Sequence, residues 1–160
     1  MSIIIKPAEK EEAEKICDFY RVVCRALENE VYSPLWQFGA YPCLQDIENH
    51  INNKNLFIAV RGSEIVSAMA AVNHGRYSSL HLFAVLPECR GTALAEKMLQ
   101  KLIETAKKRK NTKIILDVVK GNVPAEKLYR KIGFTCTGEK YERIERIGNV
   151  CFSVYEYIIR

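Results

Sequence analysis

The chain has 160 residues, of which 48% are hydrophobic and 27% charged, and its formal net charge is +5. This length and composition fit one globular domain with one hydrophobic core rather than two domains. No window reaches the run of about 18 apolar residues that a membrane-spanning helix requires, and residues 1–6 are too short for a signal peptide. We therefore expect a single domain over residues 1–160, located in the cytoplasm and without a membrane segment.

The six cysteines and three histidines do not form a metal-binding pattern. No two cysteines have Cys-x-x-Cys spacing, and no histidine stands at zinc-ligand spacing from a cysteine. In the absence of a secretory context, most of the cysteines are expected to be small buried apolar residues. We therefore predict no metal site.

The N-terminal part predicts a strand, two helices and an aromatic loop. Residues 3–6 are typical of a short strand, and acidic residues then precede a long amphipathic helix whose apolar positions recur at helical spacing over 13–27. A second helix is expected over 44–52. The intervening stretch, 29–43, is rich in aromatic residues and follows neither period. It either covers a ligand or packs as a lid on the core.

The middle of the chain predicts three antiparallel strands. Residues 56–60 and 65–72 are apolar runs separated by Arg61-Gly62-Ser63-Glu64, a turn composition, and they indicate a hairpin. A further strand is expected over 78–86. It ends at Pro87 and a short polar turn, after which small residues open a helix over 92–108. Because the amides at a helix start lack partners and the helix dipole adds positive character, this turn is predicted to bind a phosphate or pyrophosphate.

The C-terminal part predicts a strand, a helix and a hairpin. A buried strand over 114–119 would run parallel to its predecessor, because a helix connects the two. A loop with Pro124 leads into a helix over 125–132, and Gly133 is a natural C-terminal cap. Strands over 134–143 and 150–159 are expected to form the final hairpin.

Positive charge is densest over 107–110, with Lys113 just beyond. Cations at the end of a helix complement its dipole, so this run is expected to be a solvated helix C-terminus. Contact with RNA or a nucleotide is the alternative reading. No aromatic residues are interleaved as single-strand binding requires, and nucleic acid is therefore not the expected partner.

Two motifs relate the chain to a known family. The pattern Gln/Arg-x-x-Gly-x-Gly/Ala corresponds to Arg90-Gly91-Thr92-Ala93-Leu94-Ala95, which fits at Arg90 and Ala95 but has Ala93 in place of glycine. The pattern Asn-x-x-Ala-x-x-Leu-Tyr-x-x-x-Gly-Phe matches at six positions, namely Asn122, Ala125, Leu128, Tyr129, Gly133 and Phe134. On these residues the sequence resembles the GCN5-related N-acetyltransferases (GNAT), which transfer an acetyl group from acetyl-CoA to amines.

The resemblance implies an α/β (α+β) fold with a mixed, mostly antiparallel sheet of about seven strands flanked by about four helices. It implies acetyl-CoA as acyl donor and a small-molecule or peptide amine as acceptor. It also leaves room for a homodimer, because the edges of the C-terminal strands could pair between two copies.

The resemblance also assigns cofactor-binding residues. The backbone around Phe83, Ala84 and Val85 would pair with the pantetheine arm, and the amides of residues 90–95 would hold the pyrophosphate. The other side of the cofactor would be lined by Asn122, Ala125 and Leu128. Alanine adopts a positive φ less freely than glycine, so the methyl of Ala93 either stabilises a helical loop or faces the phosphates and weakens binding.

Acetyl transfer calls for a neutral amine and a protonated leaving thiolate, and deprotonating a lysine-like amine at neutral pH costs roughly 4 to 5 kcal/mol. By its family position Tyr129 is the predicted acid, against the alternative that it only packs on the core. His81 is the predicted base, against the alternative of a structural strand histidine, and Tyr141 and Glu142 are further candidates.

Strand alternation is expected to place Ser79, His81, Phe83 and Val85 on one face. The amide of Val85 could polarise the thioester carbonyl.

Three functions remain open on the sequence. The first is an N-acetyltransferase whose acceptor side is shaped by Tyr32, Trp36 and Tyr41, with Phe38 and Tyr155 as further candidates, although these aromatics could equally be core. The second is a non-catalytic acyl-CoA-binding sensor on the same scaffold. The third is a toxin-like acetyltransferase whose basic helix end grips RNA.

Overall fold

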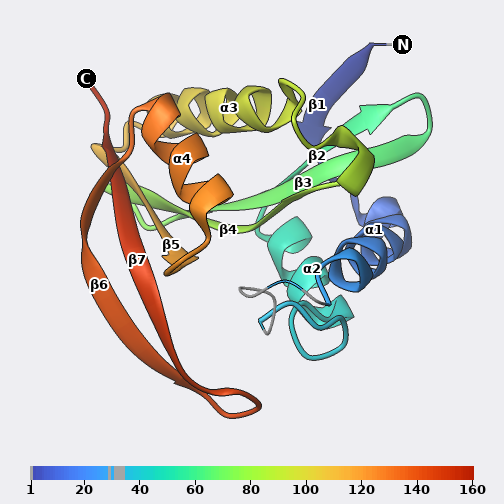
Figure 1. Ribbon diagram of the computed structural model, residues 1–160. Helices are drawn as coiled ribbons and strands as arrows, with labels where there is room; N and C mark the ends of the chain where they lie inside the picture. The colour runs from blue at the N-terminus through green and yellow to red at the C-terminus, as the bar shows by residue number, and fades with distance from the viewer. Residues whose placement is uncertain (1, 29, 31–34) are drawn as a thin grey trace.

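A computed structural model describes residues 2–28, 30 and 35–160. One sheet with helices on both faces forms the molecule (Figure 1). The elements in chain order are β1 (Ile3–Pro7), a 3₁₀ turn (Lys10–Glu12), α1 (Ala13–Ala26), α2 (Leu44–Asn52), β2 (Leu56–Arg61), β3 (Glu64–Asn73), β4 (Tyr77–Val85), a 3₁₀ turn (Pro87–Cys89), α3 (Leu94–Lys108), β5 (Lys113–Val119), α4 (Val123–Ile132), β6 (Thr135–Ile144) and β7 (Gly148–Ile158).

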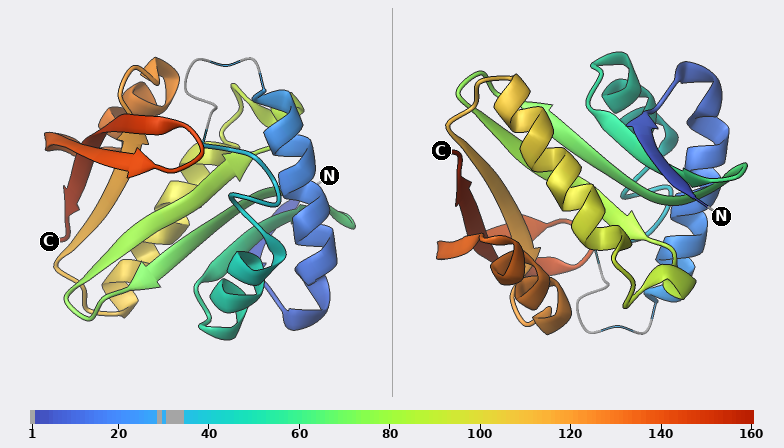
Figure 2. Two further views of the ribbon diagram at one scale, coloured as in Figure 1. Left: turned by 90° about the horizontal axis from the view of Figure 1, so that it is seen from below. Right: turned by 90° about the horizontal axis from the view of Figure 1, so that it is seen from above.

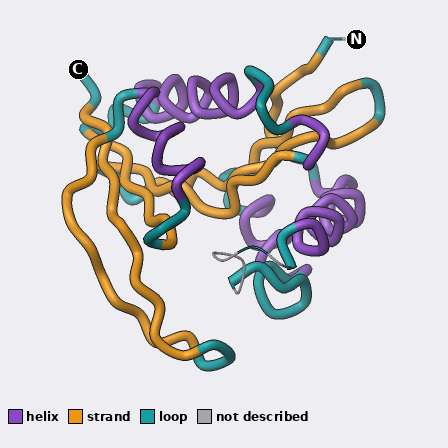
Figure 3. The backbone as a smooth tube through the Cα atoms, viewed as in Figure 1, coloured by secondary structure: helices purple, strands orange, loops and turns teal. Residues whose placement is uncertain are grey.

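The sheet has seven strands in the order β1-β2-β3-β4-β5-β7-β6. Only β4 and β5 pair in parallel, and all other neighbours are antiparallel, which confirms the mixed, mostly antiparallel sheet. The helices α3 and α4 lie on one face and α1 and α2 on the other (Figure 2). The β6–β7 hairpin curves away from the other strands (Figure 3), and β6 forms one edge of the sheet.

Apolar helix faces build the core on both sides of the sheet. Ile16 and Val23 of α1, and Ile47 of α2, are buried on one side. Met98 and Leu102 of α3 are buried on the other side, and both α1 and α3 contact β3. No helix in the described part of the chain has the length and hydropathy of a membrane span.

The basic end of α3 combines solvent-exposed and structural cations. Lys107 and Lys108 are exposed in the last turn, as expected for a solvated helix end. Arg109 instead is partly buried and donates hydrogen bonds to the carbonyl oxygen of Ala71 (2.8 Å) and to Oγ of Ser78 (3.0 Å). This arginine therefore ties α3 to β3 and β4.

The two helices that follow the predicted loops begin at different residues than expected. Helix α3 starts at Leu94 rather than at residue 92, and Ala93 is its N-cap with φ −74° and ψ 0°. Alanine adopts this right-handed conformation without strain. The positive φ of the loop falls at Gly91 (+76°) instead. Helix α4 starts at Val123, two residues earlier than predicted, because the side chain of Asn122 caps it by accepting the Ala125 amide at 3.3 Å.

A β-bulge interrupts β4. Ala70 of β3 pairs with His81 and Ala68 pairs with Ala84, so two residues of β4 lie opposite Met69 alone. At the bulge Leu82 has a φ of +55°.

The bulge changes which side chains of β4 share a face. Because paired residues lie on the same face, the register places Ser79, His81 and Ala84 together, opposite to Leu80 and Val85. The expectation that Ser79, His81, Phe83 and Val85 project together is therefore wrong for Val85, and Phe83 lies in the bulge itself. The physical reason is the inserted residue, which reverses the alternation beyond it.

The bulge is held by a buried hydrogen bond. Tyr20 of α1 is fully buried and donates its hydroxyl hydrogen to the carbonyl oxygen of Leu82 at 2.6 Å. Helix α1 thereby fixes the strand at the residue with the unusual backbone conformation.

Replacing Tyr20 by phenylalanine keeps the buried ring but leaves the Leu82 carbonyl without this donor. We expect the free energy of unfolding, measured by urea denaturation, to fall by about 1 to 3 kcal/mol. Tyr157→Phe is the matched control, since the Tyr157 hydroxyl has no hydrogen-bond partner in the described residues; its change should stay within about 0.5 kcal/mol. Equal stabilities for the two variants would contradict this role of Tyr20.

Candidate active site

The site lies where β4 and β5 diverge. The two strands pair only from Tyr77 to Leu80 of β4 and from Lys113 to Leu116 of β5, although β4 continues to Val85 and β5 to Val119. Beyond this point the β5-facing edge of β4 is open. A cavity of about 1040 Å³ occupies the divergence and is lined by residues of both strands, α3, α4, the segment before α2 and the β6–β7 hairpin.

The open edge of β4 presents a backbone donor to the cavity. Leu86 donates its amide hydrogen to the carbonyl oxygen of Val66 in β3 at 2.9 Å. Adjacent amides of a strand point to opposite sides, so the amide of Val85 points away from β3, toward the open edge. An extended ligand arm can therefore pair with β4 as a strand would.

The loop before α3 presents further unpaired donors. The first hydrogen bond of the helix runs from the Lys97 amide to the Ala93 carbonyl oxygen at 3.0 Å. Within the described residues, the amides of Gly91, Ala93 and Ala95 donate no hydrogen bond. Gly91 and Ala95 line the cavity, and their amides, together with the positive end of the α3 dipole, can bind a phosphate or pyrophosphate there.

Most of the sequence-predicted cofactor residues line this one cavity. They are Phe83, Ala84, Val85, Arg90, Gly91, Thr92, Ala95, Asn122, Ala125 and Leu128. Ala93 and Leu94 do not line it. The side chain of Leu94 is buried in the core and its amide faces Oγ1 of Thr92 at 3.3 Å, so Leu94 offers the cavity no group. The methyl of Ala93 is solvent-exposed outside the cavity wall.

Tyr129 lies on α4 with its ring buried against Phe134 (centroids 5.8 Å apart) and Tyr155 (6.1 Å). It also lines the cavity, and its hydroxyl has no hydrogen-bond partner in the described part of the chain. Burial raises the pKa of this phenol well above its ordinary value of 10. Tyr129 therefore combines core packing with a neutral hydroxyl that is available to donate into the cavity.

His81 lies on β4 at the cavity wall and retains an exposed edge. Its Nε2 lies 2.7 Å from Oγ of Ser79. The pKa of the His81 imidazole is lowered below its ordinary value of 6.5. The main cause is desolvation by the surrounding atoms, and the second is the nearby His50. At neutral pH His81 is therefore uncharged and can accept a proton.

Of the two alternative bases, only Glu142 lines the cavity. Its carboxylate pairs with Nζ of Lys140 at 2.9 Å, and the same Nζ lies 2.5 Å from a carboxylate oxygen of Asp117. Tyr141 is 74% exposed and lies outside the cavity wall. The Lys140 ammonium therefore occupies the carboxylate of Glu142, whereas the neighbour of the His81 imidazole is the neutral hydroxyl of Ser79.

The aromatic residues predicted for the acceptor side divide into two groups. Trp36 and Tyr41 line the cavity, and the Trp36 ring packs against those of Tyr20 (6.2 Å) and Tyr41 (5.9 Å). The sequence left open whether this segment covers a ligand site or packs on the core, and Trp36 and Tyr41 do both, because they line the cavity and also pack against buried rings. Phe38 instead lies under Arg21 (4.5 Å).

Of the other aromatic candidates, Tyr155 does not line the cavity. Tyr155 is fully buried and donates its hydroxyl hydrogen to Glu126 at 2.7 Å. Tyr32 lies outside the described residues.

The structure adds residues that sequence reasoning missed. Arg146, in the β6–β7 turn, lines the cavity and donates hydrogen bonds to Oε1 of Gln37 (3.1 Å) and the carbonyl oxygen of Leu35 (2.8 Å). This contact bridges the hairpin tip and the segment before α2, both of which line the cavity. Its partners are 109 and 111 residues away in sequence, so no local pattern indicates the contact.

The hydrogen-bond donors around the cavity are of the kind that coenzyme A requires. Unpaired amides stand at a helix start, and an open strand edge leads from them past Tyr129 and His81. Within the described residues, no cluster of three or more His, Cys, Asp or Glu side chains is arranged to hold a metal ion.

Comparison with solved structures identifies the fold. An acetyltransferase of the GNAT family from Streptococcus pneumoniae superposes with a TM-score of 0.78 at 18% identity, over 99% of this chain and 100% of its own. The ribosomal-protein-S18-alanine N-acetyltransferase from Escherichia coli gives 0.77 at 16%, over 99% and 94%. A Salmonella typhimurium protein, described as an acetyltransferase and solved with its cofactor acetyl-CoA, gives 0.76 at 14%, over 100% and 95%.

Comparison of sequences identifies the family. No curated protein matches the chain. Residues 22–134, which are well over half of the sequence, match the model of the acetyltransferase (GNAT) family. The motif residues Asn122 to Phe134 lie within this match, and the chain therefore belongs to the acetyltransferase (GNAT) family.

Proposed function

We propose that this protein, as a single domain over residues 1–160, is an acetyl-CoA-dependent N-acetyltransferase that acts on the primary amine of a small molecule or a peptide N-terminus. The observation that carries the proposal is one cavity that joins the open edge of β4, the unpaired amides before α3, and both Tyr129 and His81. The E. coli neighbour that acts on a ribosomal-protein alanine supports an amino-terminal acceptor by analogy of fold only.

The chain's own groups would hold acetyl-CoA along the length of the cavity. The amides of Gly91 and Ala95 would bind the pyrophosphate, and the backbone of residues 83–85 would pair with the pantetheine arm. Asn122, Ala125 and Leu128 would contact its other side. When bound, acetyl-CoA supplies a thioester carbonyl at which an amine forms a C–N bond while the C–S bond breaks and its electron pair goes to sulfur.

Three groups would assist direct attack by the amine. His81 would accept the proton that the amine nitrogen loses. The amide of Val85 would donate to the carbonyl oxygen as negative charge develops there. Tyr129 would donate its proton to the leaving sulfur, because its raised pKa keeps the hydroxyl protonated at neutral pH until the thiolate forms.

The alternative of a sensor is tested by separating binding from turnover. Calorimetry with acetyl-CoA, followed by a thiol-release assay over a panel of amines and peptides, should show binding and then release with at least one acceptor. Tyr129→Phe should leave acetyl-CoA affinity unchanged and lower kcat by about 10²-fold or more, because the leaving sulfur loses its donor. Tyr157→Phe, with a hydroxyl outside the cavity, is the control. Binding without release for any acceptor would favour the sensor, and full turnover by Tyr129→Phe would exclude an essential donor.

The pyrophosphate loop is tested by exchanging its small residues. Gly91→Ala places a side chain at a φ of +76°, where the strain is about 1 to 2 kcal/mol although no atom obstructs the new methyl. The loop is expected to shift, displacing its amides and raising the Kd of acetyl-CoA by about 5- to 30-fold. Ala93→Gly should leave the Kd within about twofold, because residue 93 already has unstrained right-handed geometry. Markedly tighter binding by Ala93→Gly would show that the methyl obstructs the phosphates.

The base is tested by the pH dependence of kcat/KM. The pKa of His81 lies below 6.5. In the plot of wild-type kcat/KM against pH we therefore expect an acid limb, in which kcat/KM falls as the pH decreases through that pKa and the imidazole becomes protonated. His81→Gln should lower kcat/KM by about 10²-fold or more and remove this limb. His50→Gln, which changes a histidine outside the cavity wall, should retain the limb. An unaltered profile in His81→Gln would exclude His81 from the mechanism.

A further inference from the structure

We propose that Ser79 and His74 form a proton relay that carries the proton accepted by His81 to the protein surface. This inference rests on the proposed function, in which His81 is the base. It adds two residues for which neither family motif nor sequence spacing suggests a role.

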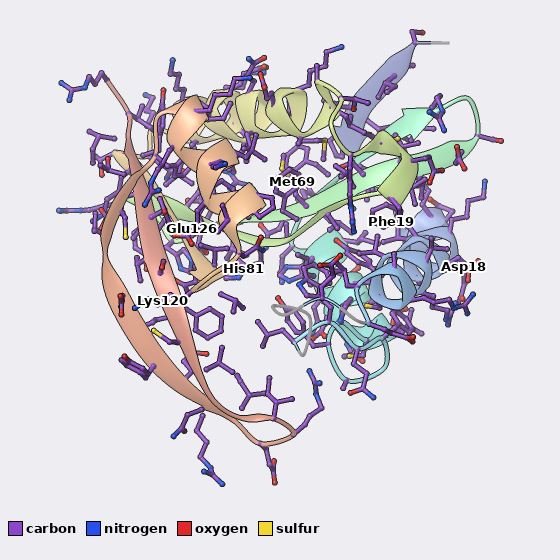
Figure 4. All side chains as sticks on the ribbon, viewed as in Figure 1. Asp18, Phe19, Met69, His81, Lys120 and Glu126 are labelled. Carbon is purple, nitrogen blue, oxygen red and sulfur yellow. The ribbon has the colours of Figure 1, made fainter. Side chains whose placement is uncertain are left out.

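The relay is a continuous chain of short contacts. Nε2 of His81 lies 2.7 Å from Oγ of Ser79, and the same Oγ lies 2.7 Å from Nε2 of His74. His81 and Ser79 line the cavity, whereas His74 lies outside its wall and is exposed. The chain therefore leads from the cavity to solvent. Figure 4 labels His81, its inner end.

The fold holds the three side chains in place. Ser79 and His81 are two residues apart and share a face of β4, as their register with Val72 and Ala70 shows. His74 lies in the turn before β4, and its ring stacks on that of Tyr77 with centroids 4.5 Å apart and an interplanar angle of 17°. The contact between His74 and Ser79 is thus built into the β3–β4 turn.

A serine hydroxyl has a single hydrogen, so it can accept from one ring and donate to the other. In the outward direction His81 donates its Nε2 hydrogen to Ser79, and Ser79 donates its own to Nε2 of His74. Nδ1 of His81 is then free to accept the proton of the amine. As it does so, the Nε2 proton of His81 moves to Ser79, the Ser79 proton moves to His74, and His74 releases its Nδ1 proton to water.

The starting arrangement must be restored before the next turnover. After one transfer, each ring carries its hydrogen on the other nitrogen, and the hydroxyl of Ser79 points toward His81. His81 lines the cavity and His74 is exposed, so once the products leave and water refills the cavity, proton exchange with water and rotation of the hydroxyl can return the rings to their first tautomers.

The charges around His81 favour departure of the proton. His50 of α2, Lys140 of β6 and His74 each disfavour a positive charge on His81, and only Asp117 of β5 favours one. The Asp117 carboxylate is paired with Lys140, which offsets its attraction. A proton on His81 is therefore in an unfavourable place, while His74 can pass it to bulk water.

The relay is tested in the full-length enzyme by Ser79→Ala and His74→Gln. Each is expected to lower kcat by roughly tenfold, less than loss of the base itself, and to leave KM for acetyl-CoA unchanged. Added imidazole, which can take the proton from His81 directly, should restore most of the lost rate. Ser79→Thr, which keeps a hydroxyl, should recover most of the rate that Ser79→Ala loses.

A second readout needs no activity. In ¹⁵N NMR of the imidazole rings, the wild-type titrations of His74 and His81 should be coupled, and Ser79→Ala should uncouple them. Wild-type turnover in Ser79→Ala, or independent titrations in the wild-type protein, would overturn the relay. Full activity in His81→Gln would instead overturn the proposed base, which distinguishes failure of the relay from failure of the function on which it rests.

Discussion

The divergence of β4 from β5 is the constraint on which the rest of the site depends. Parallel pairing ends at Leu80 and Leu116, and the backbone of β4 beyond it keeps hydrogen-bonding groups that no strand satisfies. Unpaired backbone groups inside a fold are costly unless water or a ligand pairs with them. The cavity at this point gives a ligand room to pair with these backbone groups, and its walls come from elements on both sides of the divergence.

The bulge at Leu82 determines what the divergence exposes. By inserting one residue opposite Met69, it turns Ala84 to the face of His81 and turns Val85 away from it. The hydrogen bond from Tyr20 fixes this arrangement from α1, and the Tyr20 ring stacks on Trp36, which lines the cavity. One buried tyrosine thus contacts both the bulged strand and the segment before α2.

Local sequence patterns predicted the parts of the fold that local energetics decide. The four α-helices of the described residues were all predicted, α1 from its helical periodicity and α4 from Pro124 and Gly133, and Gly133 closes α4 with a φ of +119°. The bulge could not be predicted, because the spacing of Ser79, His81 and Phe83 in the sequence is the same whether or not β4 carries an extra residue opposite Met69. The place of β7 between β5 and β6 was likewise hidden, since a hairpin pattern does not say which of its strands pairs inward.

In the candidate site, too, the residues placed by local structure could be predicted, and those placed by long-range packing could not. Residues within the two motifs meet in one cavity because each motif spans a helix start, whose geometry is local. Leu94 was assigned to the cofactor by position, but helical periodicity directs its side chain into the core. Arg146 and the pair of Ser79 with His74 depend on long-range packing or on a turn, and a sequence read strand by strand does not bring them together.

The most direct test of the account is to map acetyl-CoA onto the backbone by amide chemical-shift perturbation. The account predicts the largest changes at the amides of Val85, Gly91 and Ala95, which belong to residues that line the cavity, and small changes in β1 and β2, at the opposite edge of the sheet from β6. Changes that spare the amides of both β4 and the loop before α3 would contradict it.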